Sequence, residues 1–311
     1  MKAVRIHQYG DASQLVYEDA PLPALNRDDV LVRVIAASVN PVDWKIRDGH
    51  LSEMIQYNFP LTLGWDVSGI VESTGVDVTR FKVGDAVYSR PDVKRNGCYA
   101  EYVAVAEHEL ALKPNTISHV EAAALPLAGI TAWEALFTTA KLEAGQRVLI
   151  HGGAGGVGSL AIQLAKHAGA IVYTTTSGRN VSLVQSLGAT EVIDYERYAF
   201  NKELRNMDVV FDTLGGSVQA ASWDVLKPGG IMVSIYSKPS EEEAKKRGVR
   251  SAFIFIEPSA SILKEMGALV DDGKLRPIVG AEFTLEHAVQ AHELSEAGHA
   301  VGKIVLYVGK P

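Results

Sequence analysis

A glycine-rich turn in the middle of the chain constrains the fold more than any other feature. In "VLIHGGAGGVGSLAIQLAKHAGA", Gly153, Gly155 and Gly158 have the spacing G-x-G-x-x-G between an apolar run and an amphipathic helix pattern. The first glycine permits a tight turn, the second lets backbone approach a pyrophosphate, and the third lets helix and strand pack closely. The helix start then offers free amides and a positive dipole end to the anion. The turn predicts a dinucleotide site made of Gly153, Ala154, Gly155, Gly156, Val157 and Gly158.

The stretch "YTTTSGRN", Tyr173 to Asn180, follows this turn and contains no acid. Chains that bind NAD usually place an aspartate or glutamate here, where it bonds the ribose 2′-hydroxyl and would repel a 2′-phosphate. Instead, Thr176 and Ser177 offer hydroxyls and amides, and Arg179 offers a guanidinium suited to a phosphate dianion. The pattern favours NADPH, and the alternative is a polar loop with a solvated arginine.

Short apolar runs after residue 118 indicate a parallel sheet with crossover helices, because strands covered on both faces are continuously apolar. These runs are "RVLIHGG", "AIVYTTTS", "TEVIDY", "MDVVFDTLGG" and "GGIMVSIY". The first third alternates apolar and polar residues and is rich in Gly and Pro, as a β-rich domain would be. A closing strand, "GKIVLYV", suggests that the chain returns to this first domain. We therefore expect an α/β protein with one domain from 1–118 and 258–311 and another from 119–257.

Composition excludes several classes of protein. The net charge of −7 lacks the basic excess of a nucleic-acid binder, and no apolar run reaches the length of a membrane span. Cys98 is the only cysteine, which excludes internal disulfides and cysteine-rich metal sites, and the histidines never form H-E-x-x-H. With no apolar signal core at its start, the chain is expected in the cytoplasm and without a bound metal.

An ordered series of segments resembles the medium-chain dehydrogenase/reductase superfamily, and within it the zinc-independent quinone oxidoreductases and 2-alkenal (enone) reductases. The segments include "VNPVDWKIRDG", "PLTLGWDVSGIVESTGVDVTRFKVGDAVY", "YAEYVAV", "AAALPLAGITAWEAL", "GGAGGVGSLAIQLAK", "SLGATEVIDY", "FDTLGG", "KPGGIMVSI" and "GKIVLYV". Zinc-containing relatives carry a cysteine where this chain has Asn40, and a G-H-E turn where it has Gly64, Trp65 and Asp66. Both ligand positions are therefore lost.

The resemblance implies a GroES-like β-rich catalytic domain with a Rossmann nucleotide-binding domain between its two parts. It also implies hydride transfer from NADPH to a quinone or an α,β-unsaturated carbonyl, and a homodimer. Asn40 would lie at the nicotinamide end, Thr131 near the phosphates and Lys303 near the cofactor. Further cofactor contacts would come from Ser177, Arg179 and Tyr195 around the 2′-phosphate, and from Leu214, Gly215, Ser234 and Ile235.

Two residues are candidates for catalysis and three for the substrate site. The Asn40 amide, or the ammonium of Lys45, could stabilise the oxygen of an enolate. Alternatively, Asn40 caps the turn before Pro41 and Lys45 is solvated. Asp43 is expected to fix this loop by hydrogen bonds. Tyr57, Phe253 and Phe255 could line the substrate cleft, or they could be core residues.

Two other functions remain open at this point. The chain could reduce an acyl-thioester enone, which would need a wide groove, or it could be a noncatalytic NADPH-binding sensor or structural protein. NADPH oxidation with small quinones or enones would distinguish them.

Overall fold

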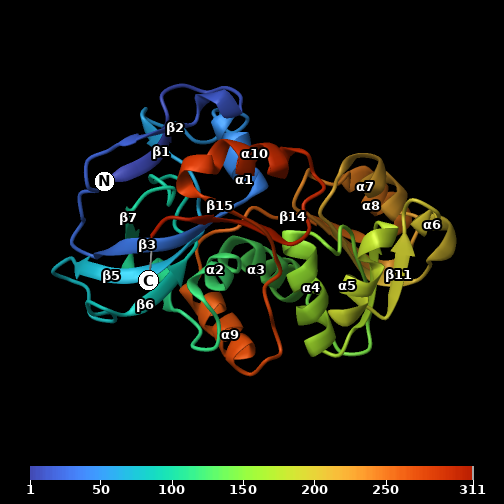
Figure 1. Ribbon diagram of the computed structural model, residues 1–311. Coiled ribbons are helices and arrows are strands. Elements are labelled where there is room, and N and C mark those ends of the chain that lie inside the picture. Colours follow the sequence, from blue (N-terminus) through green and yellow to red (C-terminus); the bar gives the residue numbers. More distant parts are fainter. Residues whose placement is uncertain (310–311) are drawn as a thin grey trace. The chain divides into compact units, whose positions relative to one another are not determined.

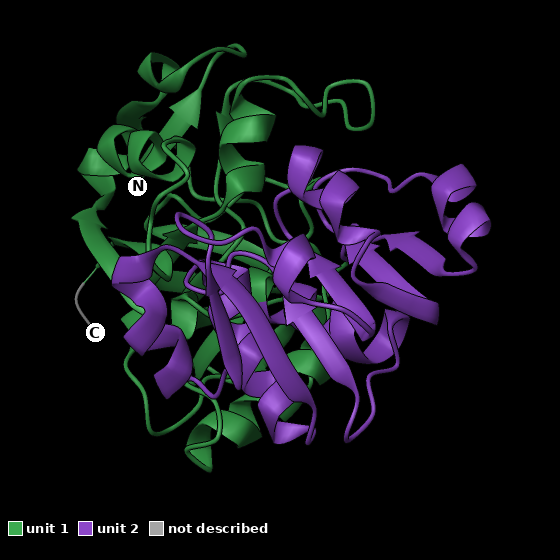
Figure 2. Ribbon diagram, turned by 90° about the vertical axis from the view of Figure 1, so that its right-hand side faces the viewer, with its two compact units in different colours: residues 1–128, 257–311 green, residues 129–256 purple. Residues whose placement is uncertain are grey.

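The computed structural model describes residues 1–309, which divide by their contacts into two compact units (Figure 2). Unit 1 comprises residues 1–128 and 257–309, and unit 2 comprises residues 129–256. The sequence predicts the first break after residue 118, but the contacts assign 119–128 to unit 1. The reason is that helix α2 (His119–Ala123) packs on strands β3 (Asp29–Val39) and β5 (Val67–Thr74).

The sheet of unit 2 is parallel and has the order β11-β10-β9-β12-β13-β14. Its two edge strands, β11 and β14, are labelled in Figure 1. Its strands are β9 (Arg147–Ile150), β10 (Ile171–Thr176), β11 (Glu191–Asp194), β12 (Met207–Asp212), β13 (Leu226–Ser234) and β14 (Arg250–Phe253). The first five coincide with the apolar runs, which confirms the parallel sheet. The edge strand β14 has only half-buried and exposed residues, so its sequence lacks the apolar signal.

Helices connect successive strands of unit 2. They are α4 (Gly156–His167), α5 (Val181–Ser186), α6 (Phe200–Glu203), α7 (Gly216–Ser222) and α8 (Glu241–Arg247). Leu160, Ile162 and Leu164 of α4 are buried, and α4 packs against β9 and β10. Helix α3 (Pro126–Trp133), which continues into a π-helical segment over Glu134–Thr139, contains the break between the units.

Unit 1 contains two sheets, with the orders β2-β1-β4 and β15-β16-β3-β5-β6-β8, and β7 pairs with β3 outside the second path. Besides β3 and β5, the strands are β1 (Lys2–Ile6), β2 (Val16–Asp19), β4 (Leu61–Thr62), β6 (Ala86–Ser89), β7 (Tyr102–Ala106), β8 (Leu110–Leu112), β15 (Val279–Thr284) and β16 (Lys303–Tyr307). The closing strand β16 pairs antiparallel with β3. The last segment of the chain thus returns to the first domain, as predicted.

Helices α1 (Pro41–Arg47), α9 (Ala260–Asp271) and α10 (Ala288–Glu296) complete unit 1. Helix α1 begins where it does because Pro41, with its fixed φ and missing N–H, suits the first helical position after the extended Asn40. Trp65 is fully buried in the core of unit 1. Within residues 1–309, no helix combines the length and the apolar character needed to cross a membrane.

Candidate functional site

Four buried polar residues lie along one edge of the larger sheet of unit 1. Asn40 follows β3, Asp66 precedes β5, Arg90 follows β6, and Lys303 begins β16. Neighbouring strands here are antiparallel, so the end of one lies beside the start of the next: Ile304 pairs with Val39, and Val67 with Ser89. Strand pairing therefore assembles these four polar groups from four distant parts of the sequence.

Asp66 is the acceptor at the centre of this edge. Its Oδ2 accepts hydrogen bonds from Ser38 Oγ at 2.7 Å and from Asn40 Nδ2 at 2.8 Å, and Lys303 Nζ lies 3.3 Å away. Its Oδ1 accepts the backbone N–H of Leu127 at 2.7 Å. The carboxylate is therefore fully engaged within unit 1. Nothing in the local sequence around Asp66 predicts this, because its partners come from three other segments of the chain.

Asn40 is held in one orientation by this edge. Lys303 Nζ donates to its side-chain oxygen Oδ1, and its Nδ2 donates to Asp66. An amide nitrogen carries two protons, so one N–H of Asn40 stays available to a ligand. Lys303 also donates to the carbonyl of Val39 at 3.2 Å, which accounts for all three of its protons. Its contacts favour a role in positioning Asn40.

Asp43 fixes the loop that carries Asn40, as predicted. Its Oδ2 accepts the backbone N–H of Asn40 at 2.9 Å and the hydroxyl of Tyr99 at 2.7 Å. The pKa of Asp43 is raised from 3.8 to about 7, chiefly by complete burial and also by the nearby Asp66, whereas the hydrogen bonds and Lys303 act in the opposite direction. Asp43 is thus a buried carboxyl that titrates near neutral pH.

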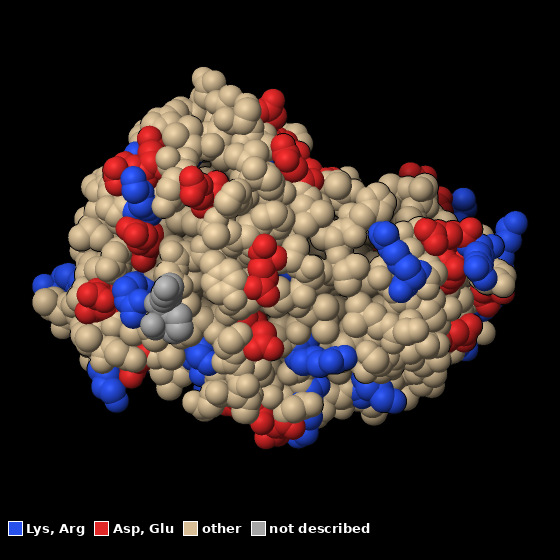
Figure 3. Space-filling view, in the orientation of Figure 1, with Lys and Arg blue, Asp and Glu red and all other residues tan. Residues whose placement is uncertain are grey.

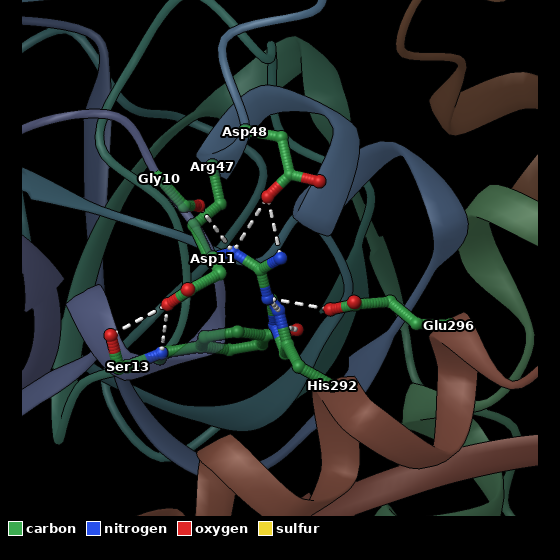
Figure 4. A network of polar contacts seen from close by, with 8 residues as sticks. Gly10, Asp11, Ser13, Arg47, Asp48, His292 and Glu296 are labelled. Carbon is green, nitrogen blue, oxygen red and sulfur yellow. Dashed lines mark hydrogen bonds and ion pairs between the residues drawn. The ribbon is translucent and has the colours of Figure 1, made fainter.

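A chain of buried polar contacts continues from Asp43 through Tyr99 and His292 to Arg47 of α1, and Figure 4 shows the contacts of Arg47. Arg47 donates to His292 Nδ1 at 3.2 Å and to Glu296 at 2.7 Å. Because guanidinium can only donate, His292 carries its proton on Nε2, which lies 3.3 Å from the Tyr99 hydroxyl. Burial and Arg47 lower the pKa of His292 to about 3, so the ring is neutral. The sequence predicts a packing or surface role for His292; the structure gives it this polar role.

Two other candidates in unit 1, Lys45 and Tyr57, are half-buried. Lys45 is half-buried on α1, its ammonium 5.6 Å from the ring centroid of Trp44, and burial lowers its pKa. Tyr57 is half-buried, donates to the carbonyl of Val93 at 2.8 Å and packs near Trp65.

In unit 2, the glycine-rich turn joins β9 to α4, as predicted. A Cβ on Gly158 would lie 2.2 Å from the carbonyl oxygen of Gly152, which explains the third glycine as a close helix–strand contact. The positive φ of 65° belongs to Gly152, one residue before the glycine expected to form the turn. Gly153 is required for a different reason, because its Cβ would lie 2.1 Å from Thr174 Oγ1. A Cβ on Gly155 would meet only the Gly152 oxygen at 3.3 Å, so backbone there is open to a ligand.

The residues expected to hold the 2′-phosphate follow two strands: Ser177 and Arg179 come after β10, and Tyr195 comes after β11. Ser177 is buried and accepts from Asn180 Nδ2 at 3.2 Å, whereas Arg179 and Tyr195 are exposed. The acid missing from β10 is supplied nearby by the loop after β11. Glu196 Oε2 accepts the backbone N–H of Gly178 at 3.3 Å.

Asp212 organises the next two loops and was not predicted from the sequence. Its Oδ1 accepts the backbone N–H groups of Leu214 and Gly215, at 3.1 and 2.8 Å, and its Oδ2 accepts Ser234 Oγ at 2.8 Å. Ile235 donates its N–H to the Asp212 carbonyl at 3.1 Å. These loops and the glycine-rich turn all follow the carboxyl ends of parallel strands, the edge where such sheets bind ligands. Thr131, by contrast, is a buried residue of α3.

The remaining candidates, Phe253 and Phe255, are exposed at the end of β14 and just beyond it. Among residues 1–309, no three His, Cys, Asp or Glu side chains are grouped as a metal site requires, and Cys98 is buried. On the face shown in Figure 3, acidic and basic side chains are interspersed, without a large area of one sign. This face offers no basic patch for nucleic acid.

The chain is similar to known protein families and to curated proteins along most of its length. Residues 26–115 match the family model of the alcohol dehydrogenase GroES-like domain, and residues 187–306 match that of the zinc-binding dehydrogenases. The NAD(P)H oxidoreductase RTN4IP1, mitochondrial, of Danio rerio is 34% identical over 99% of this chain and 91% of its own length. The NADPH-dependent alkenal/one oxidoreductase, chloroplastic, of Arabidopsis thaliana is 37% identical over 99% of this chain and 79% of its own.

A solved structure shows the same fold. The quinone oxidoreductase from Coxiella burnetii superposes with a TM-score of 0.94 and 39% identity, covering 99% of each chain. The GroES-like and Rossmann-like architecture expected from the sequence is thereby confirmed.

Proposed function

We propose a reaction for this chain from the premise that it belongs to the medium-chain dehydrogenase/reductase superfamily, among its quinone and enone oxidoreductases. The proposed reaction is reduction of a quinone, or of the carbon–carbon double bond of an α,β-unsaturated carbonyl, by NADPH without zinc. The name of the Arabidopsis relative, an NADPH-dependent alkenal/one oxidoreductase, supports both the cofactor and the substrate class.

The proposed cofactor site follows the carboxyl edge of the unit 2 sheet. The open backbone at Gly155 and the first amides of α4 suit a pyrophosphate, so the turn fits the cofactor. Thr176, Ser177, Arg179 and Tyr195 would surround the 2′-phosphate, while Thr131 and the loops ordered by Asp212 would hold the rest. A bound nicotinamide supplies the hydride.

Asn40 and Lys45 are the proposed catalytic residues. Hydride addition at the β-carbon moves the double-bond electrons to the carbonyl oxygen, and the resulting enolate takes a proton from water. The remaining N–H of Asn40 would donate a hydrogen bond to the enolate oxygen. The partly buried ammonium of Lys45 would stabilise the negative charge on that oxygen. Lys303 would act through Asn40. Tyr57, Phe253 and Phe255 are proposed to contact the acceptor.

The single observation that carries this proposal is the fixed amide of Asn40, oriented by Lys303 and Asp66 with one N–H unused. One or two donors suffice for a conjugated acceptor, which spreads the developing charge, whereas a saturated ketone concentrates it on one oxygen and gains more from a Lewis acid. The enzyme should therefore reduce conjugated carbonyls or quinones and leave saturated ketones unchanged.

The test compares an enone with the corresponding saturated ketone at equal NADPH concentration. Faster turnover of the saturated ketone would contradict the proposal, and NADPH binding without oxidation by any acceptor would favour a noncatalytic protein. Lys45→Met should lower kcat more than it raises KM if the lysine acts in the transition state. Asn40→Asp, which removes the donor at similar size, should lower kcat at least tenfold.

We also propose a homodimer in the cytoplasm. The exposed edge of β14 could pair with the same strand of a second copy, which sedimentation of the full chain would reveal. The lone cysteine suits a reducing compartment, although the zebrafish and Arabidopsis relatives are described as mitochondrial and chloroplastic. Cell fractionation tests the compartment.

A further inference from the structure

Arg90 is a buried arginine that directly follows β6. It is 2% exposed, and within residues 1–309 its Nε and Nη1 have no acceptor. Buried guanidinium groups normally bind carboxylates, because removing a charge from water costs several kcal/mol unless it is paired. Arg90 therefore differs from an ordinary structural arginine.

Two other arginines of unit 1 show what a structural arginine looks like in this protein. Arg95 donates to both carboxylate oxygens of Asp29, at 2.8 and 2.7 Å. Arg47 is as deeply buried as Arg90 but bonds to Asp48, His292 and Glu296. Arg90 has comparable burial and none of these bonds, so fold stability does not account for it.

The position of Arg90 connects it to the proposed reaction site. Because Val67 pairs with Ser89 in antiparallel register, Arg90 lies opposite Asp66, the residue that orients Asn40. The positive charge of Arg90 also acts on Tyr57, a proposed substrate contact. Burial lowers the pKa of Arg90, while Asp66, Glu257, Asp92 and Glu109 favour its charged form; none of these four forms an ion pair with it.

We propose that Arg90 is an anion-binding residue of the acceptor site and contacts a negatively charged oxygen of the substrate. The proposal rests on the reductase function proposed above. The charged oxygen has two possible sources: a permanent carboxylate on the conjugated acceptor, or the enolate oxygen that hydride transfer creates. Guanidinium suits both, because it stays charged when buried and presents several donors.

A matched pair of acceptors separates the two sources. trans-3-Benzoylacrylate and its methyl ester share one conjugated ketone and differ by a carboxylate. If Arg90 binds a permanent carboxylate, Arg90→Met should raise KM for benzoylacrylate at least about tenfold and leave the ester unchanged. If it binds the enolate oxygen, kcat should fall at least about tenfold for both acceptors. In either case Arg90→Lys, which keeps the charge, should recover part of the loss.

Stability distinguishes this role from a structural one. Arg90→Met removes an unpaired buried charge, so its midpoint of thermal unfolding should equal or exceed that of the wild type. The matched control is Arg95→Met, which leaves Asp29 buried and unpaired; it should unfold at a lower temperature without changing the ratio of the two acceptors. A loss of stability in Arg90→Met like that of the control would overturn the proposal.

Two further measurements complete the test. NADPH affinity, measured by calorimetry, should be equal in wild type and Arg90→Met; a tenfold loss would assign Arg90 to the cofactor and overturn the proposal. Unchanged kinetics with both acceptors would overturn it too. If the wild type reduces neither acceptor, the proposed function fails. Calorimetric titration with benzoate then still tests whether Arg90 binds a carboxylate. Loss of benzoate binding in Arg90→Met would support carboxylate binding by Arg90, and equal binding in both proteins would refute it.

Discussion

Lys303 and Asn40, which are 263 residues apart in the sequence, are joined by a hydrogen bond from the lysine ammonium to the asparagine side-chain oxygen. The same ammonium lies 3.3 Å from Asp66 and neutralises that buried carboxylate. The closing strand thus orients the amide proposed to act on the substrate.

Lys303→Met should lower both the free energy of unfolding and the rate of turnover. It leaves Asp66 buried without its counter-charge, which typically costs about 3–5 kcal/mol of unfolding free energy, and it frees the Asn40 amide to rotate. Urea unfolding and steady-state kinetics would measure both effects. The double variant Lys303→Met with Asp66→Asn should recover part of the stability, because the buried charge is then gone. A single variant as stable as the wild type would contradict this account of the ion pair.

Asp43 should make stability depend on pH. Its pKa of about 7 in the folded chain exceeds its ordinary value of 3.8, so the folded state holds more protons between these values. The unfolding free energy should therefore decrease as pH rises from about 4 to 7, by up to about 4 kcal/mol from this group. Asp43→Asn cannot ionise and should lose this slope in urea titrations at several pH values. An identical slope in both proteins would assign the pH dependence to other groups.

Arg179 in the loop after β10 should favour NADPH, whereas Glu196 in the loop after β11 should weaken NADPH binding. Arg179→Ala should weaken NADPH binding about tenfold or more and spare NADH, because it removes a charge-assisted hydrogen bond to the 2′-phosphate. Glu196→Gln should strengthen NADPH binding up to about fivefold, since its carboxylate occupies the Gly178 amide and repels a phosphate. Calorimetric titration with both cofactors measures these effects. Equal wild-type affinity for NADPH and NADH would refute the proposed preference.

Metal chelation should leave turnover unchanged. By the family resemblance, Asn40 stands where zinc-containing relatives carry a cysteine, and Trp65 and Asp66 stand in place of the histidine and glutamate of their G-H-E turn. Asp66 is engaged by Asn40 and Lys303. Dialysis against a chelator, followed by assay and metal analysis, is the measurement. Activity that disappears on dialysis and returns with zinc would show that a metal site has been missed.

The parallel sheet of unit 2 and its glycine-rich turn can be predicted from the amino-acid sequence alone. Continuous apolar runs indicate β9, β10, β12 and β13, because strands that are covered on both faces need apolar residues at successive positions. The spacing of Gly153, Gly155 and Gly158 is local as well. The sequence does not predict the edge strand β14, because this strand is held by backbone pairing with β13 and contains no buried side chain.

The contacts among the polar groups of unit 1, by contrast, depend on the tertiary fold. Asn40 and Lys303 were identified from the sequence, but their bond, the role of Asp66 and the unpaired state of Arg90 depend on which strands become neighbours. A buried polar residue has no periodic signature in the sequence. The free-energy cost of burying it is offset by hydrogen-bonding partners, and these can be hundreds of residues away in the chain. Antiparallel pairing of β16, β3, β5 and β6 brings those partners to one edge, and this arrangement determines what the site can bind.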